Sequence, residues 1–189
     1  MTEPVRTLQI ALPPWVDEFV LSFGRPLEDD EACMALTVAL SAENVARGGG
    51  PFAASVFHDG RLVAASVNLV LSSGFSIAHA EIMALMCAQA RLGSVALVQP
   101  PLTLFSSTEP CCQCFGALVW AGVRRLVCGA TTEDAEAVGF DEGPKPAAWA
   151  SVLEQRGIAV TQELQRADAQ RVLAHYVARG GKIYGKPSA

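Results

Sequence analysis

Residues 79–81 read His-Ala-Glu, and residues 110–114 read Pro-Cys-Cys-Gln-Cys. His79, Cys111 and Cys114 have the character of three zinc ligands, because neutral imidazole nitrogen and thiolate sulfur both bind zinc well. Three protein ligands leave the fourth tetrahedral position for water, which is the arrangement of a catalytic zinc site and not of a structural one. The two motifs therefore predict one Zn²⁺ per chain with an open coordination position.

The residues around both motifs predict that the ligands lie at the starts of two helices. Ser107-Thr108-Glu109-Pro110 offers a hydroxyl for an N-cap and a proline for the first helical position, and the apolar run 115–119 follows. Cys111 and Cys114 would share one face of the first turn, where the helix dipole favours thiolates. His79 also precedes a helical pattern of apolar residues. Two helix N-termini are expected to meet at one metal ion.

Glu81 is predicted to move protons. Two thiolates cancel the formal charge of the zinc, so a bound water would be acidified less than in an all-histidine site. A neighbouring carboxylate is then needed to accept the proton. A redox role for Cys111 and Cys114 would leave His79 and Glu81 unexplained.

A closed structural zinc site is the main alternative, and it would require a fourth ligand. The candidates are His58, His175, Cys33, Cys87 and Cys128, none of which shows ligand spacing. The three cysteines lie in apolar stretches and are predicted to be small buried core residues. Disulfides are not expected in a chain of this length without a secretory signal.

Composition predicts a single domain over residues 1–189, since 51% of the residues are hydrophobic and 17% are charged. The apolar stretches are too short and interrupted to cross a membrane, and no signal peptide is recognisable, so a cytoplasmic protein is expected. The net charge is −5 and the basic residues are scattered. A nucleic-acid groove would need a basic stripe, so no nucleic-acid partner is expected.

Helix and strand patterns alternate along the chain, which predicts an α/β three-layer sandwich around a mixed sheet of about five strands. An N-terminal arm, residues 1–26, is expected to be a packed extension. A hairpin is predicted at 56–67, because Asp59-Gly60 suits its turn. Further strands are predicted at 102–105, 125–128 and 158–161, and helices at 29–47, 131–137, 147–155 and 165–178.

From about Asp30 to Glu142 the chain resembles the cytidine and deoxycytidylate deaminase superfamily, whose zinc motifs are the two quoted above. Within it the chain is most similar to bacterial guanine deaminases, at Gly49-Gly50-Pro51-Phe52, Asn68, Trp120 and Gly139-Phe140-Asp141-Glu142. The resemblance implies an α/β/α sandwich of the cytidine deaminase type, a homodimer, and hydrolysis of a free aminated heterocycle. Guanine is the first choice, with Glu81 also protonating the ring nitrogen and the departing amine.

The same resemblance implies the residues of a substrate pocket. Phe52 and Trp120 would supply aromatic faces, Asn68 a side-chain amide for the ring, and Glu142 a second catalytic carboxylate; Ala80, between His79 and Glu81, is included among the substrate-binding positions. Each has a plainer alternative. The aromatics could be core residues, Asn68 a turn residue, and Glu142 part of a solvated acidic pair.

Residues 180–189 form a predicted tail. Guanine deaminases are similar in using the C-terminal segment as a cover over the pocket, sometimes from the partner subunit. Gly180-Gly181 would then be a hinge, and Tyr184 would close on the substrate. A frayed terminus is the alternative.

Three rival functions remain open. The tRNA adenosine deaminases resemble the chain less at Phe52, Trp120 and Glu142, and they generally carry a basic C-terminal helix. Deamination of cytosine or of an ammeline-like s-triazine is a second rival. A zinc-bearing interaction module without catalysis is a third, against which the presence of Glu81 argues.

Overall fold

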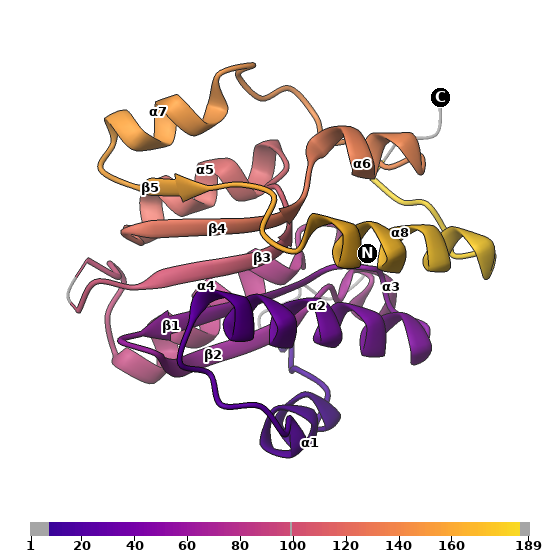
Figure 1. The fold of residues 1–189 in the computed structure, drawn as a ribbon, viewed down its shortest axis with the longest axis horizontal. Coiled ribbons are helices and arrows are strands. Elements are labelled where there is room, and N and C mark those ends of the chain that lie inside the picture. The colour runs from indigo at the N-terminus through magenta and orange to yellow at the C-terminus, as the bar shows by residue number, and fades with distance from the viewer. Residues whose placement is uncertain (1–7, 99, 186–189) are drawn as a thin grey trace, which may run out of the picture.

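A mixed five-stranded sheet forms the centre of the computed structural model, which describes residues 8–98 and 100–185. Its order is β2-β1-β3-β4-β5 (Figure 1). β1 pairs antiparallel with β2 and β3, whereas β3, β4 and β5 run parallel. The strands are β1 Ala53–His58, β2 Arg61–Val67, β3 Thr103–Thr108, β4 Arg125–Ala130 and β5 Ala159–Thr161.

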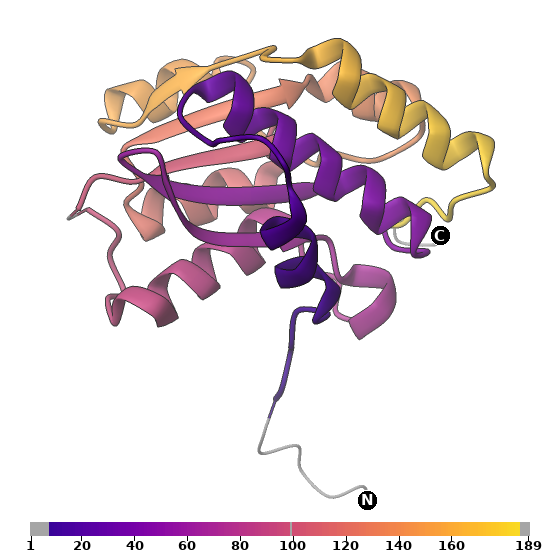
Figure 2. The same cartoon turned by 60° about the horizontal axis from the view of Figure 1, so that its bottom comes forward.

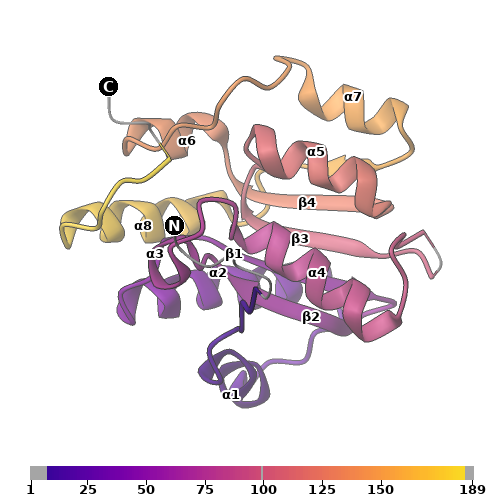
Figure 3. The same ribbon diagram turned by 180° about the vertical axis from the view of Figure 1, so that it is seen from behind.

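Helices cover both faces of the sheet, which confirms the three-layer α/β/α architecture. α2 and α8 lie on one face (Figure 1), and α4, α5 and α7 lie on the other (Figure 3). The helices are α1 Trp15–Ser22, α2 Asp30–Ala46, α3 Val70–Ser73, α4 Ala80–Leu92, α5 Cys112–Ala121, α6 Thr132–Ala137, α7 Trp149–Gln155 and α8 Arg166–Ala178.

Two hydrophobic cores follow from the alternation of side chains along the strands. Phe105 and Val127 point into the core beneath α2 and α8. Their neighbours Leu104 and Leu126 point into the core beneath α4 and α5. Because the central strands are buried on both faces, consecutive residues of β3 and β4 are apolar at their centres and face opposite cores.

Local signals in the sequence account for several element boundaries. Asp29 caps α2 by accepting a 2.6 Å hydrogen bond from the amide of Ala32. Asp59 and Gly60 both have positive φ, as a tight hairpin turn requires, and they join β1 to β2. Thr131 caps α6 in a capping box with Asp134. The predicted helix at 29–47 and the hairpin turn are thus confirmed.

The predicted start of the cysteine helix was wrong. Ser107 and Thr108 are the last two residues of β3, which pairs with β4 as far as Thr108 and Ala130. Cys111 is the N-cap of α5, and its side chain makes no cap bond. Pairing along the parallel strands thus took precedence over a local capping pattern.

The sequence patterns also missed two helices. α1 lies at the β2 side of the sheet (Figure 2) and buries Val16 in the core beneath α2. α3 is a single turn between Asn68 and the zinc motif. The predicted arm, residues 1–26, therefore contains a packed helix, while residues 1–7 lie outside the described residues. Across the described residues, no helix combines the length and apolarity needed to cross a bilayer.

Candidate active site

His79, Cys111 and Cys114 come together at the N-termini of α4 and α5, as predicted. Their ligand atoms all lie within 4.8 Å of one another. The Nδ1 atom of His79 is 3.4 Å from the sulfur of Cys111 and 3.6 Å from that of Cys114. Zinc bonds of ordinary length at tetrahedral angles place nitrogen and sulfur ligands about 3.6 Å apart. The three side chains therefore fit one Zn²⁺, with a fourth position left open.

Backbone contacts hold both ligand segments. His79 is the N-cap of α4, and its amide donates to the carbonyl of Ile77 at 2.8 Å. The amide of Cys112 donates to the carbonyl of Glu142 at 2.8 Å, which joins the start of α5 to the Glu142 loop. A hydrogen bond with Cys114 lowers the pKa of the Cys111 thiol to about 4. The same contact raises the pKa of the Cys114 thiol, so Cys111 is the thiol of the pair that ionises first, and the thiolate is the form that binds zinc.

Glu81 lies in the first turn of α4 and is buried. The hydroxyl of Ser106 on β3 donates a 3.2 Å hydrogen bond to its Oε1 atom. Burial, the largest effect, raises the pKa of the Glu81 carboxyl above its ordinary value. A carboxylate with a raised pKa accepts a proton more readily, which suits a general base.

A pocket opens beside these residues. Besides the zinc ligands His79 and Cys111 and the acid Glu81, it is lined by Phe52, Asn68, Glu109, Phe140, Asp141, Glu142, Tyr184 and Gly185. Four residues predicted for substrate binding or catalysis, Phe52, Asn68, Glu142 and Tyr184, therefore reach the same pocket as the zinc ligands.

Glu142 presents a buried carboxylate to this pocket. Among the described residues, its Oε2 atom has no hydrogen-bond partner. Burial is the main cause that raises the pKa of Glu142 to about 8, and the charge of Cys111 adds to it. With this raised pKa the carboxyl is largely protonated near neutral pH. An N–H donor from a bound ligand would satisfy the buried oxygen and favour the carboxylate form, so this atom is suited to accept a hydrogen bond from a ligand.

Asn68 directly follows β2, and its side chain lies at the pocket. Its backbone amide donates to the carbonyl of Phe52 at 2.9 Å, which fixes the two loops to each other. Its Oδ1 atom accepts a 3.1 Å hydrogen bond from the amide of Val70. With the oxygen held in this way, the NH₂ group remains as the donor for a ligand.

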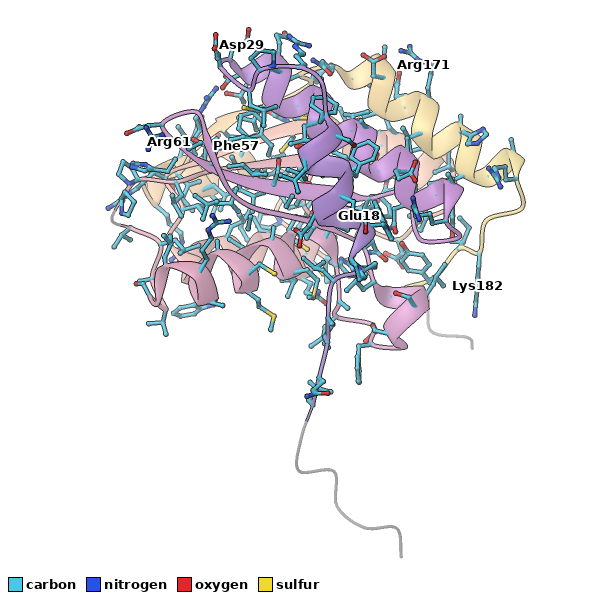
Figure 4. All side chains as sticks on the ribbon, turned by 90° about the horizontal axis from the view of Figure 1, so that it is seen from below. Glu18, Asp29, Phe57, Arg61, Arg171 and Lys182 are labelled. Carbon is cyan, nitrogen blue, oxygen red and sulfur yellow. The ribbon has the colours of Figure 1, made fainter. Side chains whose placement is uncertain are left out.

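Tyr184 packs into the pocket from the segment that follows α8. Its ring meets Phe140 edge to face, with 5.2 Å between the ring centroids. Phe140 in turn meets Phe52 edge to face at 4.8 Å. The hydroxyl of Tyr184 is buried and, within the described part of the chain, has no hydrogen-bond partner. Lys182, at the start of this segment, lies beyond the end of α8 (Figure 4).

Comparison with known proteins agrees with this geometry. The family model of the cytidine and deoxycytidylate deaminase zinc-binding region matches residues 27–130. The chain belongs to this family.

Two relatives of this deaminase are described as guanine deaminases. The enzyme of Bacillus subtilis is 37% identical over 113 residues, which cover 59% of this chain and 71% of that protein. The solved structure from Nitrosomonas europaea is 44% identical, with a TM-score of 0.86, and the match covers 94% of this chain and 100% of that one. A further structure, in complex with 8-azaguanine, is 46% identical with a TM-score of 0.85, covering 92% and 98% of the two chains.

Trp120 does not lie in the pocket of the deaminase, contrary to the prediction. Its side chain is 84% exposed on the outer face of α5, beside Ile82 and Met86 of α4. Ala80 is fully buried in the core beneath α4 and α5. Its carbonyl accepts a 2.6 Å hydrogen bond from Ser66, so it helps to hold the helix that carries Glu81.

Glu109 is a pocket residue of the deaminase that the sequence patterns did not single out. Its Oε2 atom accepts hydrogen bonds from the amide and hydroxyl of Thr132, and its Oε1 atom accepts one from Gln162. Lys145 donates to Thr132 Oγ1 and to the carbonyl of Pro110. These partners lie far apart in the sequence, so no local pattern could have connected them.

Proposed function

We propose that this deaminase converts free guanine to xanthine and ammonia. The observation that carries the proposal is the buried Oε2 atom of Glu142, which has no partner among the described residues and lies in the same pocket as Asn68 and Glu81. Guanine has N–H groups that such an acceptor can bind, and cytosine offers fewer. The guanine deaminase relatives, which match over most of this chain, support the same choice.

Proton transfer is assigned to Glu81. When bound, Zn²⁺ supplies an acidified water and a Lewis acid at the pocket. Glu81 accepts a proton from the attacking water at its carboxylate and delivers it to the purine ring nitrogen as the new C–O bond forms. It then takes the remaining proton of the added hydroxyl and passes it to the amino group, which leaves as ammonia when the C–N bond breaks. The hydrogen bond from Ser106 to Oε1 of Glu81 fixes the orientation of the carboxylate through these steps.

Binding of the base is assigned to three side chains of the pocket. Phe52 offers an aromatic face, Asn68 donates from its amide to the oxygen or nitrogen of the ring, and Glu142 accepts from the N–H groups of guanine. A site built to pair several polar groups discriminates strongly against a ligand that leaves one of them unpaired.

The C-terminal tail is proposed to cover the bound base. Tyr184 packs on Phe140, and the hydroxyl of Tyr176 holds the tail by donating a 2.5 Å hydrogen bond to the carbonyl of Lys182. Gly180, with φ of 74°, follows Arg179, the C-cap of α8, and can serve as the hinge. A cover that excludes water strengthens the polar contacts to the base, and it disfavours a tRNA substrate.

A homodimer is proposed to form through the exposed apolar face of α4 and α5. This surface contains Ile82, Met86, Val95, Ala117 and Trp120. Trp120 and Val95 are among the most exposed large apolar residues, and such residues gathered on one face are typical of an interface. The cysteines within the described residues are all free, which suits the reducing cytoplasm that we propose as the location.

Ammonia release from a panel of free bases and nucleosides tests the proposal. The panel contains guanine, cytosine, adenine, ammeline, guanosine and an adenosine-containing tRNA hairpin, with the zinc-loaded protein in each reaction. The expected result is the highest kcat/KM with guanine. Faster turnover of the tRNA hairpin or of ammeline would reject guanine as the substrate, and light scattering of the same sample tests the dimer.

A further inference from the structure

Asn44 lies near the C-terminal end of α2, and its side chain is buried but is not among those that line the pocket. Its Nδ2 atom donates two hydrogen bonds, at 2.8 Å to the carbonyl of Gly50 and at 3.0 Å to the carbonyl of Asn68. The two acceptors belong to the two loops that enter the pocket, one before β1 and one after β2. One amide group therefore joins both loops to α2.

The Gly49–Phe52 loop is shaped around this side chain. The amide of Gly49 donates to the backbone carbonyl of Asn44 at 2.7 Å. A Cβ atom on Gly49 would lie 2.3 Å from Asn44 Oδ1, so only glycine lets the loop lie against the amide. The loop then leads directly to Phe52, which lines the pocket.

The same contact fixes the Asn68 backbone. The carbonyl of Asn68 accepts from Asn44, while its amide donates to Phe52. Both backbone polar groups of Asn68 are thus held, and its side-chain oxygen is held by Val70. The position of the free NH₂ group of Asn68 in the pocket therefore depends on Asn44.

We propose that Asn44 is a positioning residue for the substrate site, which acts through Asn68 and Phe52 without touching the base. This inference rests on the proposed function, because it assigns Asn68 to the binding of guanine. An aliphatic residue at position 44 would leave two buried carbonyl oxygens without donors, and an aspartate would place an acceptor against both. Either change loosens the two loops while the zinc ligands on α4 and α5 keep their contacts.

Hydrogen exchange tests the loops without any substrate. We expect Asn44→Ala to raise amide exchange in residues 49–52 and 68–70, with exchange in α4 and α5 unchanged. Ser41→Ala is the matched control, because Ser41 is also buried on α2 but bonds only the carbonyl of Val38 in its own helix. If Asn44→Ala does not fold, Asn44→Asp is measured in its place, because it preserves the side-chain volume. Unchanged exchange in both loops would overturn the proposal.

Kinetic measurements with guanine then distinguish a positioning role of Asn44 from a general effect on the stability of the protein. Below the melting temperature of every variant, we expect Asn44→Ala to lower kcat/KM by roughly tenfold or more, since small misplacements of binding groups are costly. The loss should divide between kcat and KM as it does in Asn68→Ala, and zinc content should stay at one per chain. In an Asn68→Ala background the Asn44→Ala change should cost less than about threefold, because coupled sites are not additive.

Additive losses, or a loss no larger than that of Ser41→Ala, would overturn the positioning role. A wild-type protein that releases no ammonia from guanine would instead reject the proposed function. In that case the exchange measurement alone still decides whether Asn44 holds the two loops.

Discussion

The hydroxyl of Ser106 donates a 3.2 Å hydrogen bond to Oε1 of Glu81, and both residues are buried. Ser106 lies opposite Ala54 in the register of β3 and β1, and Ala54 lies opposite Ser66 of β2. Ser66 donates to the carbonyl of Ala80 at 2.6 Å. Two serines on either side of a small alanine therefore fix the first turn of α4 on the sheet, and with it the direction of the Glu81 carboxylate.

Ser106→Ala is expected to lower kcat for guanine by roughly tenfold, the size of one hydrogen bond to a charged group, with zinc content unchanged. Steady-state kinetics and metal analysis measure both quantities. Thr37→Val is the control, because Thr37 is a buried hydroxyl that joins α2 to Ser55 on the opposite face of the sheet. Full activity in Ser106→Ala would show that burial alone orients Glu81.

Glu81→Gln tests proton transfer at constant side-chain shape. We expect about one zinc per chain to remain, since His79, Cys111 and Cys114 are untouched, and activity to fall by at least roughly 10², as for a positioned general base. Elemental analysis beside the ammonia assay gives both values. An active variant would remove Glu81 from the mechanism, and a variant without metal would make it a structural residue.

The zinc ligands and Glu81 could be predicted because all four residues belong to two short sequence motifs, each at the start of a helix. Resemblance alone did not place Trp120 correctly, although helical geometry argues against a position in the pocket. It follows Cys111 by nine residues, which is two and a half turns or about 180° around the helix. A residue so spaced faces away from the metal, toward the exposed surface of α5.

The sequence patterns did not identify the residues that support the site through contacts with distant parts of the chain. Ser106 was hidden within a strand that was predicted to end one residue earlier, and Asn44 within a helix whose polar residues looked ordinary. Glu109 was interpreted as part of a helix cap. In each case the contact that gives the residue its role is made by tertiary pairing, which local patterns do not contain.

Glu142→Gln replaces the buried acceptor at constant volume. We expect kcat/KM for guanine to fall by roughly tenfold or more, because the variant amide cannot accept at both positions, while zinc content and Tm do not fall. Tm is expected to hold because the carboxylate oxygen it replaces has no partner among the described residues. Glu136→Gln on the exposed side of α6 is the control. Equal losses of rate and Tm would make Glu142 a scaffold residue.

Acid stability is expected to depend on Asp134, which joins α6 to α8. Arg166, with its Nε 2.8 Å away, is the main cause that lowers the pKa of Asp134. A carboxyl with a lowered pKa stabilises the fold above its unfolded pKa, near 4, and this contribution is lost as the pH falls toward the folded value. Asp134→Asn should therefore lower Tm by a few degrees at pH 7 and by less at pH 3. Asp168→Asn, in an exposed pair with Arg171, should change Tm little. An equal decrease at both pH values would contradict the linkage.

The tail can be displaced by one methyl group at Gly50. A Cβ atom there would lie 1.9 Å from the hydroxyl oxygen of Tyr184, so Gly50→Ala forces the tyrosine out of its place. We expect kcat/KM for guanine to fall by roughly tenfold, as it should on deletion of residues 182–189, because one or two kcal/mol of closure is lost. Gly24→Ala is the control, since a Cβ atom at Gly24 meets nothing within 4 Å.

Tyr184→Phe separates the two contributions of the tyrosine, because it keeps the ring against Phe140 and removes the buried hydroxyl. If closure alone matters, the kcat/KM of Tyr184→Phe stays close to that of wild type while that of Gly50→Ala falls. Full activity in both Gly50→Ala and the deletion would show that the tail does not act as a cover.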